Sequence, residues 1–413
     1  MFRFRSFSVA ATLALLLVFT TTPAAMLGAQ DEAKPQILFT NVNVFDGKSE
    51  TLSEGMSVLI EGNLIKKVAK DDIEAGDDAT VIDGGGRTLA PGFIETHAHL
   101  ALMGPTISAM ESNSTWEDFG IHATRMAEMF LMQGVTTVRD AGGANGGLRR
   151  AIDAGQIRGP RYYPSGAFLG TRGGHADFSS FTSPPGTPSN FNRLNLAQDI
   201  NGVDDVYKFG RNNFRMGATQ LKFMISGGVV SAFDPWQLLA GAQEEIEAAV
   251  QVANEYESYV MAHAYRKEAI MNALNAGVKS IEHGFSFDCE IAEIMNTKGA
   301  YITTNLTAFD PGLLDIPAVR DQPTSLAKAR SASATFANYV PNMKKCPVKR
   351  GFQTDCVGTV AACNIQIAYE KHLNNEFYGP HQSMITLTSI GGEIVALSGP
   401  FMNPYLEGKL GVI

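Results

Sequence analysis

Hydrophobic and polar residues follow different patterns on the two sides of residue 90 in this 413-residue chain. Between Pro35 and Ala90, short alternating runs such as 37–45 are separated by turn sequences such as Asp46-Gly47. Alternation with a period of two is typical of strands with one buried face, and Asp-Gly pairs are typical of tight turns. The pattern predicts a small antiparallel β domain over residues 30–90.

From Thr88 onward, apolar runs alternate with segments such as 244–257 and 267–276, in which apolar residues recur every three or four positions. This recurrence predicts amphipathic helices between parallel strands. A (β/α)8 TIM barrel over residues 91–400 is therefore expected, and it fits better than a doubly wound sheet, because no Gly-x-Gly-x-x-Gly follows the first strand. The candidate strands are 88–97, 135–140, 161–168, 219–226, 258–264, 279–284, 300–305 and 348–355.

One connection, between Gly170 and Gly217, is unusually long, and its first part, 171–190, is rich in glycine, serine and proline. Long loops in compact domains are usually functional or disordered. Because this loop begins at the C-terminal end of a predicted strand, we expect it to form a wall or lid of the active site.

Both ends of the chain differ from its middle. Residues 1–29 read as a signal peptide, with Arg3 and Arg5 before a short apolar core and small residues up to Ala29. They predict export to the periplasm or the outside, and no membrane association after cleavage. Residues 401–413 read as the start of a C-terminal β segment that would complete the N-terminal domain and is cut short.

The amino-acid composition of the chain limits the kinds of molecule that it is expected to bind. The chain is 45% hydrophobic and 18% charged, as in globular enzymes, and its net charge of −9 argues against nucleic acid and anionic membranes. Oligomeric state is left open, with a homo-oligomer as one option. Export permits a disulfide, and Cys346 with either Cys356 or Cys363 is the favoured pair, although buried free thiols are equally ordinary.

Two histidines, His97 and His99, end the first predicted barrel strand. Alternate residues of a strand face the same side, so both imidazoles point into one space. Two neutral imidazoles facing one point suit a divalent metal such as zinc. A pair of polar residues at a strand end is the simpler interpretation of this motif alone.

Later predicted strands supply further candidate ligands. Lys222 lies inside an apolar strand, where an unpaired charge is costly. His263, His283 and Asp355 each end a strand, at the face where barrel enzymes build their sites. Each residue alone could be structural, as a core histidine, an exposed lysine or a helix-capping aspartate. The ordered set favours a metal centre.

This arrangement resembles the amidohydrolase superfamily from about Gln36 to the C-terminus. The sequences around His175, 261–265 and 281–284 resemble its imidazolonepropionase-like and prolidase-like branch, which includes Xaa-Pro and Xaa-basic dipeptidases and ochratoxin-type amidases. The resemblance implies two divalent metal ions, with zinc as first choice. The ligands that it implies are His97, His99 and Asp355 for one ion, His263 and His283 for the other, and a bridging N6-carboxylated Lys222.

The resemblance also implies a mechanism, in which a hydroxide bridging the metals attacks a carbonyl and Asp355 passes a proton to the leaving nitrogen. His175 and Tyr265 are candidates for binding the substrate, or else a loop hydrogen-bonder and a packed aromatic ring. Arg172 could anchor a carboxylate, but a solvated loop arginine is favoured.

The expected substrate is a dipeptide or an N-acyl amino acid, such as an Xaa-Pro dipeptide or an ochratoxin-like amide. A cyclic amide or a lactone is the alternative within the enzymes. A non-catalytic metal-binding barrel is the alternative of another class. Lys222 and Asp355 disfavour it, because a structural zinc needs neither a bridging ligand nor a spare base.

Overall fold

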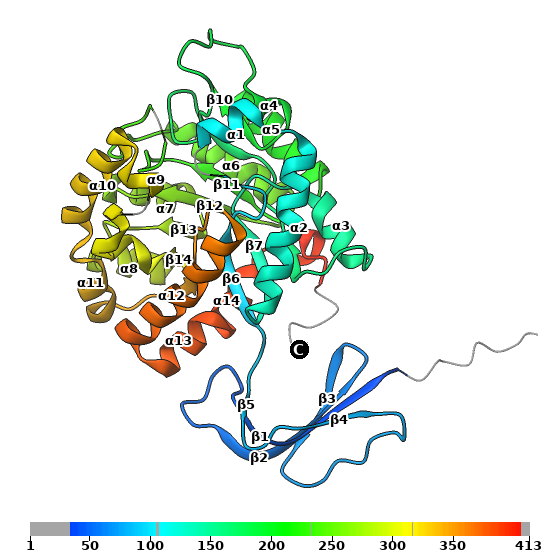
Figure 1. Ribbon diagram of the computed structural model, residues 1–413. Helices are drawn as coiled ribbons and strands as arrows, with labels where there is room; N and C mark the ends of the chain where they lie inside the picture. Colours follow the sequence, from blue (N-terminus) through cyan, green and yellow to red (C-terminus); the bar gives the residue numbers. More distant parts are fainter. Residues whose placement is uncertain (1–33, 105–106, 232, 316, 406–413) are drawn as a thin grey trace, which may run out of the picture.

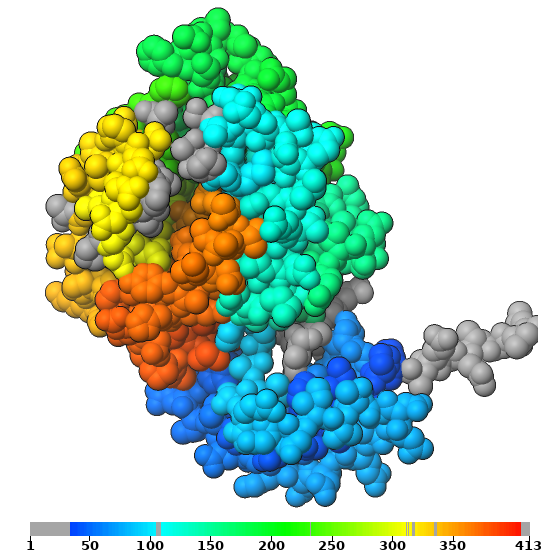
Figure 2. Space-filling view, viewed as in Figure 1, coloured from blue at the N-terminus to red at the C-terminus, as the bar shows by residue number. Residues whose placement is uncertain are grey.

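A computed structural model describes residues 34–104, 107–231, 233–315 and 317–405 of the protein. A small β-sheet forms a separate lobe beside a larger body in which helices surround parallel strands (Figures 1 and 2). The lobe contacts the larger body where the Nε2 atom of His381 lies 3.2 Å from the carbonyl oxygen of Lys48. The predicted signal peptide at 1–29 and residues 406–413 of the predicted C-terminal β segment lie outside the described residues. The described start of that segment, 401–405, was predicted wrongly, because it holds the end of helix α15 (Gly399–Met402) and a turn instead of a strand.

The N-terminal lobe is a five-stranded sheet in the order β3-β2-β1-β4, with β5 also paired to β1. Its strands are β1 (Gln36–Val44), β2 (Ser53–Glu61), β3 (Leu64–Ala69), β4 (Thr80–Asp83) and β5 (Thr88–Leu89). The β1–β2–β3 meander is antiparallel, as predicted, but β4 and β5 run parallel to β1. The difference arises because the chain crosses after β3 to the far side of β1.

The strands of the larger body form two parallel sheets, β6-β7-β8 and β10-β9-β11-β12-β13-β14-β15. Backbone hydrogen bonds join the sheets at both ends, from Thr219 N to Pro164 O (2.7 Å) and from Asp355 N to His97 O (3.0 Å). This α/β arrangement is of the predicted barrel type, but strand pairing among the described residues is not continuous around a closed barrel. The strands are β6 (Phe93–Ala98), β7 (Val135–Asp140), β8 (Arg161–Tyr163), β9 (Phe168–Thr171), β10 (Ala197–Ile200), β11 (Leu221–Met224), β12 (Val260–Ala264), β13 (Ser280–His283), β14 (Tyr301–Thr304) and β15 (Arg350–Phe352).

The predicted strand 161–168 is two strands, β8 and β9, that belong to different sheets. Gly166 lies in the bend between them with a φ of 76°, and a Cβ there would come within 2.7 Å of the Asn213 side chain. Only glycine fits this left-handed and crowded position. Strand β10 was not predicted, because its sequence Ala-Gln-Asp-Ile is short and lacks alternation.

Helices cover the outside of both sheets (Figure 1). The largest hydrophobic core lies between β11–β14 and helices α5–α8. Among the described residues, no helix combines the length and hydropathy that a membrane crossing requires. The helices are α1 (Ile107–Asn113), α2 (Trp116–Met132), α3 (Gly146–Asp153), α4 (Asn190–Arg193), α5 (Val203–Arg215), α6 (Gln243–Glu255), α7 (Lys267–Ala276), α8 (Cys289–Lys298), η1 (Leu306–Phe309), η2 (Pro311–Asp315), α9 (Pro317–Arg320), α10 (Pro323–Phe336), α11 (Tyr339–Lys345), α12 (Val360–Tyr378), α13 (Pro380–Leu387), α14 (Ser389–Ala396) and α15 (Gly399–Met402).

The disulfide prediction was wrong. Cys346 pairs with Cys289, and Cys356 pairs with Cys363. Cys289 begins α8 and Cys346 caps α11, and these helices pack together although 57 residues separate the two cysteines. Four cysteines allow three pairings, and sequence spacing alone does not choose among them. Because Cys356 is oxidised, it is not a thiol ligand beside Asp355.

Candidate metal centre

Five of the six predicted metal ligands lie at or near the C-terminal ends of the parallel strands, whereas Lys222 is the second of the four residues of β11. They come from β6 in the three-stranded sheet, and from β11, β12, β13 and the segment after β15 in the seven-stranded sheet. All have buried side chains except that of Asp355, which is 27% exposed. The ligands are His97 in β6, His99 just after it, Lys222 in β11, His263 in β12, His283 at the end of β13 and Asp355 after β15.

Asp355 lies between the histidines of the first strand and that of β13. Its Oδ1 atom is 3.3 Å from His97 Nε2 and 3.1 Å from His99 Nε2, and its Oδ2 atom is 3.9 Å from His283 Nδ1. Two ligands of one tetrahedral zinc ion are about 3.3 Å apart, since each bond is about 2.0–2.1 Å long. The nitrogen and oxygen donors and their spacing therefore fit a divalent metal ion.

Lys222 faces the same point, with its Nζ atom 3.3 Å from His97 Nε2. Burial lowers the pKa of Lys222 to about 8, although the carboxylates of Glu282 and Asp355 oppose the shift. Buried lysines change their pKa readily, which makes the neutral amine accessible. The neutral amine is also the form that reacts with carbon dioxide, so Lys222 fits the carboxylated bridging role that the resemblance implies.

His263 and His283 form the second part of the site, with ring centroids 4.5 Å apart. Burial holds the pKa of each imidazole well below its usual value, and the neutral ring is the form that binds a metal. His283 and Asp355 have φ values of 70° and 53°, a left-handed region that costs energy for residues other than glycine. Such backbone strain is typical of functional sites.

A buried ion pair between Glu282 and Arg139 holds the His97 ring in place. Its Nδ1 atom lies 2.6 Å from Glu282 Oε2, and both Glu282 oxygens lie 3.0 Å from Arg139 Nη2. Although burial raises it, Arg139 and His97 hold the pKa of Glu282 well below its usual range. A carboxylate behind a ligand histidine fixes its tautomer and ring orientation. This pair was not predicted from the sequence, although Arg139 inside the apolar strand 135–140 is a signal of the same kind as Lys222.

The two predicted substrate-binding residues lie against the second pair of histidines. The His175 ring stacks on His263 at a centroid distance of 4.3 Å, and the Tyr265 ring lies 4.5 Å from His263. Burial lowers the pKa of His175 to about 4, so its ring is neutral near pH 7. The guanidinium of Arg172 makes its contacts away from the metal ligands. It donates to the carbonyl of Ser183 (3.0 Å), and its Nη1 atom lies 3.4 Å from Asp199 Oδ2.

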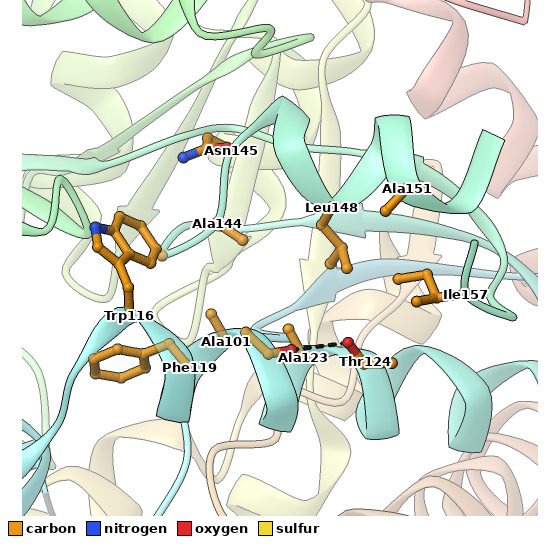
Figure 3. Close-up of a pocket in the computed structure, with 12 residues that line it drawn as sticks. Ala101, Trp116, Phe119, Ala123, Thr124, Ala144, Asn145, Leu148, Ala151 and Ile157 are labelled. Carbon is orange, nitrogen blue, oxygen red and sulfur yellow. Dashed lines mark hydrogen bonds between the residues drawn. The ribbon is translucent and has the colours of Figure 1, made fainter. Parts of the chain in front are cut away.

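A cavity of about 420 Å³ lies between α2 and α3. Its wall is mostly apolar, with Trp116 and Phe119 on one side and Leu148 on the other (Figure 3). Ala101 and Gly143 bring it close to the loops that follow β6 and β7. None of the six candidate ligands lines this cavity, so it is separate from the site.

Parallel strands that end in a cluster of imidazole, carboxylate and amine groups define a barrel-type enzyme fold with a candidate metal centre. A sequence profile of the amidohydrolase family matches residues 88–393, and the chain belongs to this family. The predicted resemblance is thereby confirmed, and family membership agrees with the N/O donor set of the site.

Relatives point to the same branch of the family. Ochratoxinase from Aspergillus niger is 35% identical over 185 residues, which cover 42% of this chain and 38% of that protein. A crystal structure described as an amidohydrolase is 32% identical, with a TM-score of 0.80 and coverage of 88% and 87% of the two chains. The crystal structure of a prolidase complexed with N-methylphosphonate-L-proline is 31% identical, with a TM-score of 0.81 and coverage of 89% of each chain.

Proposed function

We propose that the protein is a metal-dependent amidohydrolase that cleaves an amide or peptide bond in a small substrate, either a dipeptide or an N-acyl amino acid. The observation that carries the proposal is the convergence of His97, His99 and His283 on Asp355, with Lys222 buried beside them. The prolidase and ochratoxinase relatives support an Xaa-Pro dipeptide or an ochratoxin-like amide as the substrate class.

Two divalent ions, with zinc as first choice, would be held by these residues together with His263 and an N6-carboxylated Lys222. When bound, such ions polarise a carbonyl and lower the pKa of water. The donor set supports this cofactor, because imidazole and carboxylate suit zinc, and because a fully buried Lys222 has a clear role only if it loses its positive charge.

The chain's own groups provide the acid–base and binding chemistry. Although burial raises it, His283, His97 and His99 hold the pKa of the Asp355 carboxyl well below its usual value, so Asp355 is present as the carboxylate, the form that can accept a proton. Its partial exposure lets it take a proton from an attacking water and deliver it to the leaving nitrogen. His175 and Tyr265 lie where they can orient the scissile carbonyl or a substrate carboxylate.

The test is a hydrolysis screen of the metal-reconstituted protein. The panel pairs Xaa-Pro and Xaa-basic dipeptides and N-acyl amino acids with cyclic amides and lactones, and Asp355→Asn serves as the inactive control. Release of a free amine from the first set is expected. Turnover of cyclic amides or lactones alone would replace the substrate class, and metal binding without any turnover would favour a non-catalytic barrel.

Two further proposals complete the account. Export is supported by the sequence of residues 1–29 and by the two disulfides, since disulfides persist in oxidising compartments. Closure into a (β/α)8 barrel is supported by the hydrogen bonds at both seams between the sheets. N-terminal sequencing of the protein from its native source tests the first, and an experimental structure tests the second.

A further inference from the structure

The loop that follows β11 packs directly on His175. Gly228 lies so close that a Cβ there would come within 2.1 Å of the His175 ring. The Oγ atom of Ser231, in the same loop, lies 2.8 Å from His175 Nδ1. In the same region, His263 Nε2 lies 3.1 Å from the carbonyl oxygen of Gly227. This loop therefore fixes the position of the His175 ring and provides the hydrogen-bond partner of its Nδ1 atom.

A buried lysine from outside the barrel holds the loop in place. Lys328, in helix α10, donates to the carbonyls of Ser231 (2.6 Å) and Asp234 (2.9 Å), and its Nζ lies 3.4 Å from Ser231 Oγ. Trp236 Nε1 donates to Ser331 Oγ (3.1 Å), one helical turn beyond Lys328. A lysine has three donors and no acceptor, so these three oxygens use its full capacity.

The contacts of Ser231 Oγ decide where its proton lies. Because Lys328 can only donate, the hydroxyl receives from the lysine and must donate elsewhere. Two acceptors are within reach, His175 Nδ1 at 2.8 Å and the carbonyl of Gly228 at 3.3 Å. The shorter contact places the proton on the His175 side, since O–H hydrogen bonds are normally 2.7–2.8 Å long. Because Nδ1 accepts this proton, it carries none of its own, and the proton of the His175 ring lies on Nε2.

The carboxylate of Asp234 also lies near His175 Nδ1, and it would favour a proton on that nitrogen. Its Oδ2 atom lies 3.8 Å from that nitrogen, beyond hydrogen-bond distance, and instead accepts from the amide of Gly228 at 2.7 Å. Its Oδ1 atom lies 3.9 Å from Lys328 Nζ, which offsets the charge. The carboxylate of Asp234 therefore stabilises the loop through the amide of Gly228, and the hydroxyl of Ser231 remains the hydrogen-bonding partner of His175 Nδ1.

We propose that Ser231 and Lys328 are positioning residues that keep His175 in the Nε2–H tautomer, so that this N–H donates to the carbonyl oxygen of the substrate as negative charge develops there. The inference rests on the proposed amide hydrolysis and deepens it. A fixed donor aimed at a developing oxyanion stabilises the transition state more than the ground state. Loss of its support therefore lowers kcat more than it raises KM.

The decisive variant is Ser231→Ala, which removes one oxygen atom and the donor to Nδ1. In zinc-reconstituted protein with 15N-labelled histidine, the wild-type His175 signal, assigned with His175→Gln, is expected to show the proton on Nε2. In Ser231→Ala the proton is expected to shift towards Nδ1, and kcat to fall by about tenfold, less than the 10²–10³ caused by losing an oxyanion donor itself. Metal content stays unchanged. Ser231→Thr restores both the tautomer and kcat.

Lys328→Met removes the first group in the series of contacts from Lys328 through Ser231 to His175. Like Ser231→Ala, it is expected to lower kcat. Ser231→Ala decides the question if Lys328→Met does not fold. The matched controls are Ser333→Ala, whose hydroxyl donates only within α10, and Lys208→Met on an exposed surface. An unchanged tautomer and unchanged kcat in Ser231→Ala would overturn the inference. A wild-type protein that cleaves no amide would overturn the proposed function, while the tautomer measurement would still decide the role of Ser231.

Discussion

His97 and His175 are imidazoles of the same site, the first fully buried and the second partly buried, but different parts of the molecule hold them. His97 lies in a barrel strand, and its Nδ1 contacts Glu282 in another strand, which Arg139 in a third strand neutralises. His175 lies in a loop, and its Nδ1 contacts Ser231 in a second loop, which Lys328 in an outer helix holds. On the strand-held side, charged groups inside the sheet hold His97, whereas on the loop-held side a neutral hydroxyl and a lysine from an outer helix hold His175.

We expect this difference to separate metal binding from turnover, two properties that the site must combine. Substitutions on the strand-held side should change metal affinity and stability together, because they disturb a buried ion pair and a ligand. Substitutions on the loop-held side should change turnover at constant metal content, because they move His175, which we propose contacts the substrate. The following variants test that separation.

Asp355→Asn should have the largest effect on kcat, because Asp355 is proposed both as a metal ligand and as the base. Asparagine keeps an oxygen at the ligand position but cannot accept the proton, so kcat should fall by about 10³-fold. Metal content, measured by mass spectrometry, should remain close to that of the wild type. Turnover that survives the substitution would remove Asp355 from the role of base.

Gly228→Ala tests the loop-held side with a single methyl group. The new Cβ would meet the His175 ring at 2.1 Å, so the ring must shift. A displacement of about 1 Å near the reacting centre should lower kcat by about 10²-fold at unchanged metal content. Gly120→Ala is the matched control, since a Cβ at that position meets nothing within 4 Å. Equal rates for the two variants would contradict the packing argument.

Glu282→Gln tests the strand-held side. It leaves Arg139 as an uncompensated buried cation, which should cost about 3–5 kcal/mol of stability. It also removes the carboxylate behind His97, which should weaken metal binding by about 10- to 100-fold in a chelator competition. Glu128→Gln breaks the exposed pair with Arg158 and should change neither quantity. Wild-type metal affinity in Glu282→Gln would show that this carboxylate does not support the ligand.

The two disulfides give the smallest expected effect on turnover. Replacing Cys289 and Cys346 by serine opens a 57-residue loop and should cost about 4 kcal/mol, whereas replacing Cys356 and Cys363 opens a seven-residue loop and should cost about 2 kcal/mol. Only the second pair adjoins Asp355, so only its loss should lower kcat, by a few-fold. Denaturant unfolding and kinetics of both double variants measure the contrast, and a larger loss of turnover in the first pair would reverse it.

The sequence predicted what periodicity and strand-end chemistry can encode. His97, Lys222 and His283 were found because polar groups that end or interrupt apolar strands are unusual, and the structure places all three together. Strand β10 was missed because four residues without alternation carry no periodic signal. The cysteine pairing was wrong because it depends on how α8 and α11 pack.

The supporting groups needed coordinates for a different reason. Ser231 and Lys328 are 97 residues apart, and neither differs in local sequence from an ordinary loop serine or surface lysine. Glu282 adjoins His283 in sequence, yet it supports His97 on another strand. Ligands at strand ends follow a regular geometry, whereas the groups behind them depend on side-chain packing that no periodicity records.

The most direct test of the central claim is the number of divalent ions that the purified protein binds, measured for the wild type and for Lys222→Met. We expect two ions per chain in the wild type and fewer than two in the variant, because methionine fills the space of Lys222 but cannot bridge two ions. A wild type that binds no divalent ion, or a variant that binds two with the same affinity, would contradict a binuclear centre built on Lys222.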